Sequence, residues 1–288
     1  MPFNQTVAAV YIPENWLDET QVNFEAALQV SKRSKMVDIG GAKKGDIFHI
    51  PKVVSLASSA MPETNTDVVD NSPAAPGEVI LTLNKSRMCS VYLPKHTNLY
   101  LIKYDLRREY TEKIGHILAQ DLEDDCLTEL DVAENATVGL VTSDITDLTV
   151  RNAMKELDQD NIPDMGRMLV FHPSQRNVLL GIADYVRSSS IGKNQAVSPL
   201  VTGELLNIYG MEALFSSRVK DETVGADTGH ANWLFNKESL VVGHSNPDLE
   251  YNYIPLRKMW LLSGDFFYGV KGFRTGTTDG THVKIRTL

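Results

Sequence analysis

The stretch "YDLRREYTEKIGHILAQDLEDDCLTELD", residues 104–131, carries the strongest helix signal in the chain. Its apolar residues recur at spacings of three and four, which is the repeat of one face of an α-helix. They are Leu106, Tyr110, Ile114, Ile117, Leu118, Leu122 and Leu130. At a rise of about 1.5 Å per residue, a helix over this stretch would be a rod about 40 Å long. The pattern therefore predicts one long helix with an apolar face to bury.

The opposite face of this predicted helix is acidic. The stretch carries nine acidic residues against three basic ones, so it contributes −6 of the chain's net charge of −9. The acids are Asp105, Glu109, Glu112, Asp121, Glu123, Asp124, Asp125, Glu129 and Asp131, and the bases are Arg107, Arg108 and Lys113. Such a face is either simply solvated or meets basic residues of another surface.

Composition limits the function classes. The 288 residues, 42% of them apolar, suffice for one large domain or two of ordinary size. The net negative charge argues against a general nucleic-acid binder, which relies on cationic contacts to phosphates. The two cysteines, Cys89 and Cys126, imply neither a disulfide framework nor a zinc site. The chain has no apolar run long enough to span a bilayer and no signal-peptide pattern, so we expect synthesis in a cytoplasm.

A partial phosphate-loop pattern occurs in "IGGAKKGDIF", residues 39–48. A phosphate loop requires a lysine and then a hydroxyl residue after its last glycine, to hold the phosphates and the metal ion. After Gly45 the chain instead has Asp46 and Ile47, and the residues that follow alternate as in a strand. We therefore interpret this stretch as a glycine turn into a strand, not as a nucleotide site.

The remaining pattern is a mixture of helices and strands. Two β-branched stretches flank a long polar segment near residues 58–77, which predicts an extended hairpin. A two-stranded hairpin is marginally stable by itself, so it should rest on a neighbour. From about residue 145 the pattern becomes α/β, and the last sixty residues are typical of several strands with glycine turns.

No catalytic, cofactor or metal site is predicted from local motifs. Asp158, Asp160 and Asn161 resemble the start of a calcium loop, but Pro163 stands where that loop needs glycine. The seven histidines show no ligand spacing, and Ser188–Ser190 lack the G-x-S-x-G turn of a nucleophilic serine. A thiol next to an acidic helix face, as in Cys126, should be inert. A site assembled from distant residues stays open.

The order of these segments resembles the major capsid proteins of tailed double-stranded DNA phages, with the α+β Hong Kong 97-type fold, and is podovirus-like. The stretch "GGAKKGDIFHIP" resembles the entry to the extended hairpin, or E-loop, and "YDLRREYTEKIGHILAQDLEDDCL" resembles the spine helix. The stretches "NIPDMGRMLVFHPSQRNVLL", "GELLNIYGMEALFSSRV" and "FYGVKGFRTGTTDGTHVKIRTL" are similar to later parts of that fold. The resemblance covers nearly the whole chain in order.

The resemblance implies five segments. They are an N-terminal arm at 1–39, the E-loop at 40–100, a peripheral domain with the spine helix at 101–144, an α/β axial domain at 145–240, and strands returning to the peripheral domain at 241–288.

The resemblance also implies partners. The chain would assemble with itself into hexamers and pentamers of an icosahedral virion capsid, without catalytic activity, cofactor or membrane. A separate scaffolding protein, a portal, a decoration protein and packaged double-stranded DNA without sequence-specific contacts complete the expected partners. Some members cross-link a lysine to an asparagine, but no matching pair is evident here.

Two sets of residues are candidates for contacts between subunits. The first lies at the base of the hairpin, and the second on the acidic face of the long helix. They are Gly40, Gly41, Lys43, Lys44 and Gly45, and Asp121, Asp124 and Asp125. The lysines, with Lys32, Arg33 and Lys35, would form a basic patch that meets a neighbour's acidic rod. Two alternatives remain: an encapsulin-like shell that encloses cargo, and a soluble α/β enzyme.

Overall fold

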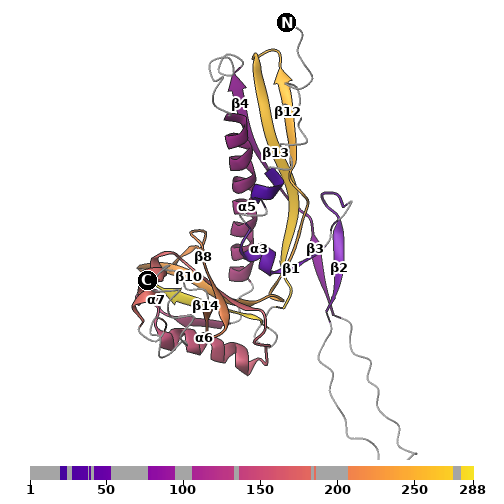
Figure 1. The fold of residues 1–288 in the computed structure, drawn as a ribbon. Coiled ribbons are helices and arrows are strands. Elements are labelled where there is room, and N and C mark those ends of the chain that lie inside the picture. The colour runs from indigo at the N-terminus through magenta and orange to yellow at the C-terminus, as the bar shows by residue number, and fades with distance from the viewer. Residues whose placement is uncertain are drawn as a thin grey trace, which may run out of the picture.

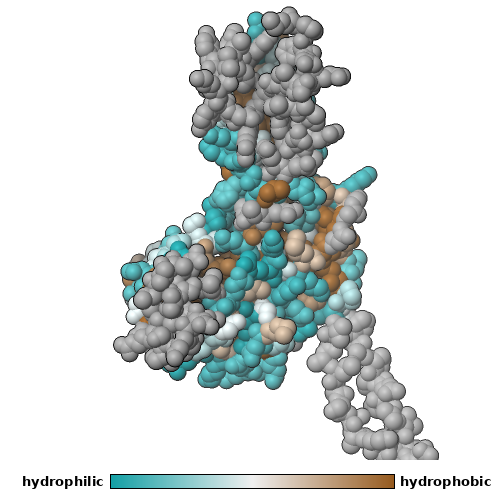
Figure 2. All heavy atoms as spheres, viewed as in Figure 1, coloured by the Kyte–Doolittle hydropathy of each residue, from teal (hydrophilic) through white to brown (hydrophobic). Residues whose placement is uncertain are grey.

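The computed structural model describes residues 20–24, 28–37, 39, 42–52, 77–94, 106–132, 136–182, 185, 207–274 and 280–288. These residues form a five-stranded sheet, a seven-stranded sheet and a separate two-stranded ribbon. In Figure 1 the five-stranded sheet and the long helix α5 (Leu106–Val132) make an elongated unit, with the seven-stranded sheet at its lower end and the ribbon beside it. The described surface around the seven-stranded sheet is mainly hydrophilic (Figure 2).

The predicted long helix is confirmed. Helix α5 spans Leu106–Val132, with Ile114, Leu118 and Leu122 almost completely buried. Ile117, which the periodicity placed on the apolar face, is exposed instead, whereas Cys126 and Leu127 are buried. Ile117 lies about 60° around the helix from Ile114, on the side away from Leu118 and Leu122, so it falls outside the buried stripe.

The five-stranded sheet lies along α5 and is organised around its longest strand, β13. It runs in the order β1-β11-β13-β12, and β4 also pairs with β13. All pairs are antiparallel except β1 with β11. The strands are β1 (Lys35–Met36), β4 (Lys85–Pro94), β11 (Leu240–His244), β12 (Asp248–Ile254) and β13 (Met259–Gly272).

The returning side of the predicted hairpin is interrupted. Strands β2 (Ile47–Lys52) and β3 (Gly77–Thr82) pair as an antiparallel ribbon. The returning strand was expected to continue without a break through Tyr92, but two residues separate β3 from β4, and β4 leaves the ribbon to pair with β13. The expected tip at 58–77 lies outside the described residues, apart from Gly77.

The seven-stranded sheet is mixed. Its order is β5-β14-β10-β6-β8-β7, with β9 on the edge of β10. Strands β5 and β14 are parallel, as are β6 and β8, and the other pairs are antiparallel. The strands are β5 (Ala136–Gly139), β6 (Arg167–Phe171), β7 (Asn207–Ile208), β8 (Met211–Phe215), β9 (Asp221–Val224), β10 (Asp227–Asn236) and β14 (His282–Thr287).

Three further helices have described bounds: α3 (Val30–Arg33), α6 (Asp147–Gln159) and α7 (Ser174–Gly181). Helix α6 begins after Thr146, whose side-chain oxygen accepts a hydrogen bond from the Thr149 backbone N–H, a normal N-cap. It ends before Pro163, as the sequence predicts. Helices α6 and α7 bury their apolar residues against the seven-stranded sheet and form a second core there.

The strands do not follow the expected segment boundaries. The segment 241–288 supplies β11, β12 and β13 to the five-stranded sheet, but its last strand, β14, lies inside the seven-stranded sheet. Strand β5, from the segment 101–144, pairs with β14 in that same sheet. The sheets therefore interleave segments that the sequence order keeps apart.

The ribbon approaches β13 so closely that one position must be glycine. A side chain on Gly269 would place its Cβ 2.4 Å from the backbone oxygen of Thr82, which cannot move without disturbing β3. We predict that Gly269→Ala destabilises the chain by about 1–3 kcal/mol through overpacking. Gly181→Ala is the matched control, because nothing lies within 4 Å of its new Cβ. Urea unfolding of the two variants measures the difference, and equal midpoints would contradict the close approach.

Candidate functional site

The base of the ribbon is a tight turn. Gly45 has a φ of +97°, a conformation that glycine adopts without strain. Its N–H donates to the carbonyl of Leu83 at 2.8 Å, and the Leu83 N–H donates back to the carbonyl of Asp46 at 3.1 Å. The Asp46 carboxylate accepts a hydrogen bond from the Lys43 N–H at 2.7 Å. Asp46 therefore closes the turn, in the position where a phosphate loop would have its lysine.

The neighbouring candidates are placed unequally. Gly40 and Gly41 lie outside the described residues. Lys43 and Lys44 are exposed, and Lys44 Nζ lies 3.0 Å from the hydroxyl of Ser86 at the start of β4. The turn thus connects the entry to β2 with the exit from β3, and a role for it as a hinge stays a proposal.

The ribbon has one packed face and one open face. Phe48, Ile50 and Val79 pack around a small cluster with Leu81, against β11 and the end of β13. On the other face Ile47 and Ile80 are exposed. Because strand side chains alternate between faces, the ribbon carries apolar side chains on both faces. Its outer face therefore offers apolar surface to a partner.

The N-terminal segment is held against α5 by a buried carboxylate. Glu123 of α5 accepts hydrogen bonds from the backbone N–H groups of Gln29, Val30 and Ser31 and from the Ser31 hydroxyl, over 2.6–3.1 Å. These N–H groups stand at the start of α3, where helix donors lack partners within the helix. A side chain from α5, more than ninety residues away, therefore takes the place of the missing N-cap.

The acidic candidates on α5 are engaged within the chain. Arg218 binds Asp124 through two nitrogens, with Nε 2.7 Å from Oδ1. Asp125 accepts a hydrogen bond from the Tyr268 hydroxyl and lies 3.1 Å from Lys85 Nζ, and Arg87 lies 3.7 Å away. Arg87 also approaches Asp121 at 3.8 Å. The three carboxylates thus tie α5 to β4, β13 and the loop after β8.

These contacts lower the pKa of Asp125. Burial opposes its ionisation, but the hydrogen bond from Tyr268 and the ion pairs with Lys85 and Arg87 outweigh burial and lower its pKa. A carboxyl whose pKa is lower in the folded state contributes stability above its unfolded pKa of about 3.9, and that contribution is lost as the pH falls. At neutral pH the acidic face of α5 therefore stabilises contacts within the chain.

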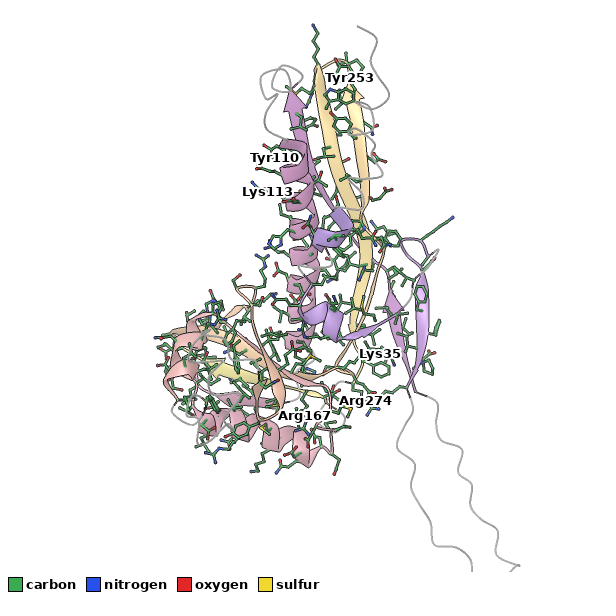
Figure 3. All side chains as sticks on the ribbon, viewed as in Figure 1. Lys35, Tyr110, Lys113, Arg167, Tyr253 and Arg274 are labelled. Carbon is green, nitrogen blue, oxygen red and sulfur yellow. The ribbon has the colours of Figure 1, made fainter. Side chains whose placement is uncertain are left out.

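The expected basic patch is divided. Arg33 forms a two-nitrogen ion pair with Glu212 of β8. The ammonium of Lys35 lies over the Phe273 ring, 4.0 Å from its centroid (Figure 3 labels Lys35). Arg33 and Lys35 are thus used to join elements of one chain, so the five cations do not act as one free surface.

The candidate calcium-loop residue Asp158 and the Cys126 thiol also lie in structural, non-catalytic environments. Asp158 forms an ion pair with Arg167, whose side chain is buried and also donates to the carbonyls of Pro163 and Ile162. Burial raises the pKa of the Cys126 thiol well above its usual range. Among the described residues no group of three or more His, Cys, Asp or Glu side chains is arranged to hold a metal ion. No described helix has the length and apolarity to cross a membrane.

The chain was compared with known proteins. No family model and no curated protein matches the sequence. Solved structures do match. One from Mycobacterium phage Che8 is 19% identical with a TM-score of 0.66, and the match covers 91% of this chain and 90% of that one. The capsid structure of the cyanophage P-SCSP1u is 15% identical with a TM-score of 0.68, over 89% and 86%.

A third match is the asymmetric unit of the bacteriophage PhiM1 mature capsid, 14% identical with a TM-score of 0.63, over 91% and 87%. Because these likenesses extend over nearly the full length of both chains, they show the fold. The α+β Hong Kong 97-type fold expected from the sequence is confirmed.

The buried Glu123 leads to a prediction about the N-terminal segment. Glu123→Gln replaces a two-oxygen acceptor by one oxygen and a donor, so at least one amide of α3 loses its partner. Hydrogen bonds to a charged group contribute about 1.5–3 kcal/mol, and amide exchange at Gln29–Ser31 should accelerate about tenfold or more. Glu109→Gln, in the first turn of α5, is the control. Unchanged exchange in Glu123→Gln would show that the carboxylate does not hold α3.

A second prediction concerns the acids of α5. Asp124→Lys with Asp125→Lys should destabilise the folded chain by about 2–4 kcal/mol, because it sets new cations against Arg218, Lys85 and Arg87. The control, Asp144→Lys with Asp227→Lys, makes the same change in net charge at two exposed acids. Urea unfolding followed by fluorescence of the buried Trp233 measures both. Equal midpoints for the two double variants would show that Asp124 and Asp125 do not stabilise the folded chain.

Proposed function

We propose that this chain is the major capsid protein of a tailed double-stranded DNA phage. In this proposal it assembles into hexamers and pentamers of an icosahedral shell, and its location is the virion capsid after synthesis in the host cytoplasm. The full-length likeness to chains from phage capsid structures carries the proposal. The role is structural, and no catalytic activity is assigned.

The shape of the chain supports a role in assembly. The ribbon stands beside the long unit with Ile47 and Ile80 exposed on its outer face. An isolated two-stranded ribbon is marginal in water, and added apolar and main-chain contacts stabilise it. A neighbouring subunit would supply those contacts, as the E-loop interpretation expects.

The charge of the chain fits a container for DNA. A net charge of −9 provides no excess of cations to neutralise phosphates, so packaged DNA would be enclosed without tight or sequence-specific binding. A scaffolding protein, a portal and a decoration protein would be further partners of such a shell.

Expression of the chain followed by electron microscopy and nuclease treatment tests the proposal. Closed particles of uniform size that take up and protect DNA when supplied with their packaging partners support it. Particles that enclose protein cargo instead of DNA would indicate an encapsulin-like shell. A chain that stays monomeric at all concentrations, with or without a scaffolding protein, would overturn the proposal.

The E-loop interpretation predicts the effect of a deletion. Removing residues 58–76 leaves β2 and β3 intact and joined by residues 53–57, a length that suits a hairpin loop. We expect near-normal circular dichroism and a yield of closed particles reduced about tenfold or more, because contacts to the neighbour are lost. Replacing 58–76 by a Gly/Ser segment of equal length is the control for length. Unchanged particle yield and stability would show that this segment makes no contact needed for assembly.

A further inference from the structure

The face of the five-stranded sheet that points away from α5 carries a row of exposed side chains. Gly264 faces α5, where its Cβ would meet Ile114, so Asp265 beside it faces outward. In the strand register Asp265 lies opposite Asp248 of β12 on one side and Met88 of β4 on the other. Residues directly opposite each other share a face, so these three form one row. Glu250 lies two residues after Asp248 on β12 and therefore points to the same face. We call these four residues the acidic row.

The acidic row places like charges together without a cation. Asp248 and Asp265 are direct cross-strand partners, an arrangement that destabilises a sheet when both are charged. Burial and the charges of Asp248 and Glu250 raise the pKa of Asp265. Within the described residues no lysine or arginine lies at ion-pair distance from any of the three carboxylates. Met88, in the same row, is 72% exposed.

A basic surface with an exposed apolar residue lies at the far end of the same sheet. Strands β12 and β13 are joined by the turn Pro255–Lys258, and Leu256 in this turn is 98% exposed. Arg257 and Lys258 follow it, and neither forms an ion pair with a described residue. Arg257 lies over the Tyr92 ring, 5.5 Å from its centroid. An apolar side chain flanked by two cations therefore stands at the end of a hairpin. We call Leu256, Arg257 and Lys258 the hairpin tip.

Aromatic rings stiffen the strands that carry this tip. Tyr251 stacks on Trp260 with ring centroids 4.6 Å apart and planes within 3°, and the ring of Tyr253, the cross-strand partner of Trp260, is tilted with its centroid 4.9 Å away. Figure 3 shows Tyr253 near the upper end of the β12–β13 hairpin. Because paired aromatic rings add stability beyond their burial, the tip is presented in a fixed direction and loses little freedom on binding.

From this complementarity we propose that the hairpin tip of one copy of the chain docks on the acidic row of a second copy. Leu256 would contact Met88, and Arg257 and Lys258 would neutralise Asp248, Asp265 and Glu250. The apolar residue on one surface is flanked by cations and the one on the other surface by carboxylates. Charges of opposite sign would therefore fix how the two surfaces align. The inference rests on the proposed function, since it describes a contact between subunits of the shell.

The contact cannot form within one chain. Met88 stands opposite Asp265, which is six residues along β13 from Met259, where the tip begins. At about 3.3 Å per residue this is about 20 Å, and β13 is a continuous paired strand. The contact is also heterologous, because the tip and the row are different surfaces, so it links copies in series instead of in closed pairs.

Disulfide trapping tests the contact. In a Cys89→Ser background, Met88→Cys and Leu256→Cys are introduced together, and assembled particles are oxidised and run on a non-reducing gel. A bridge needs Cα atoms within about 7 Å, so any bridge between these positions joins two copies. We expect a ladder of dimers and longer products from the double variant, and little from either single variant.

The matched control pairs Leu256→Cys with Met165→Cys. Met165 is 90% exposed but lies between α6 and β6, away from the five-stranded sheet. A ladder of equal strength from this pair would show random collision and overturn the proposal. Particles that form normally but give no Met88–Leu256 ladder would overturn it as well, while leaving the proposed function intact.

Charge exchange provides the second measurement. Arg257→Glu with Lys258→Glu, and separately Asp248→Lys with Asp265→Lys, should each lower the ladder yield about tenfold through repulsion at two ion pairs. Combining all four changes should restore it. Failure of the restoration, with folding unchanged by circular dichroism, would overturn the proposal. If the wild-type chain stays monomeric with and without a scaffolding protein, the proposed function fails, and oxidation of the concentrated chain still decides whether the contact exists.

Discussion

The burial of α5 is the constraint on which the other parts depend. One core contains residues of α5 together with Trp233 and Phe235 of the seven-stranded sheet and Phe266 of the five-stranded sheet. The two sheets share no strand, so this common core fixes one against the other. The polar contacts follow from it, since Glu123 reaches α3 and Asp124 reaches Arg218 only while α5 lies in this position. Loosening α5 would therefore loosen the N-terminal segment and both sheets together.

The sequence predicted the elements whose signals are local. The three-and-four spacing around Ile114 and Leu118 predicted α5, and the turn at Gly45 before alternating residues predicted β2. The position of β4 could not be predicted, because its partner β13 is about 170 residues away and its own pattern is also compatible with a continued hairpin. Ile117 was misplaced because a spacing of three from Ile114 is compatible with either side of the apolar stripe, and only the packed structure shows which side is buried.

The candidate contact residues show the same limit. Sequence spacing identified Asp121, Asp124 and Asp125 as one acidic surface, but not that Arg218, Lys85 and Arg87 would meet them from distant segments. An ionised group near the core requires a partner, and only the tertiary structure says which. The acidic row was missed because its members come from three strands. Asp248, Asp265 and Met88 become neighbours through register alone, and no sequence pattern connects them.

The place of β14 determines when the seven-stranded sheet can form during synthesis. This strand, His282–Thr287, lies between β5 and β10, so until it arrives β5 has no partner in the sheet and β10 pairs only with β6 and β9. A ribosome releases the chain from its N-terminus, and the nascent chain must therefore carry an open sheet until nearly all of the described residues have emerged. Contacts far apart in sequence also slow folding. A chain arrested during translation before residue 282 therefore keeps unpaired edges on β5 and β10, and unpaired edges are where a strand of another chain can pair.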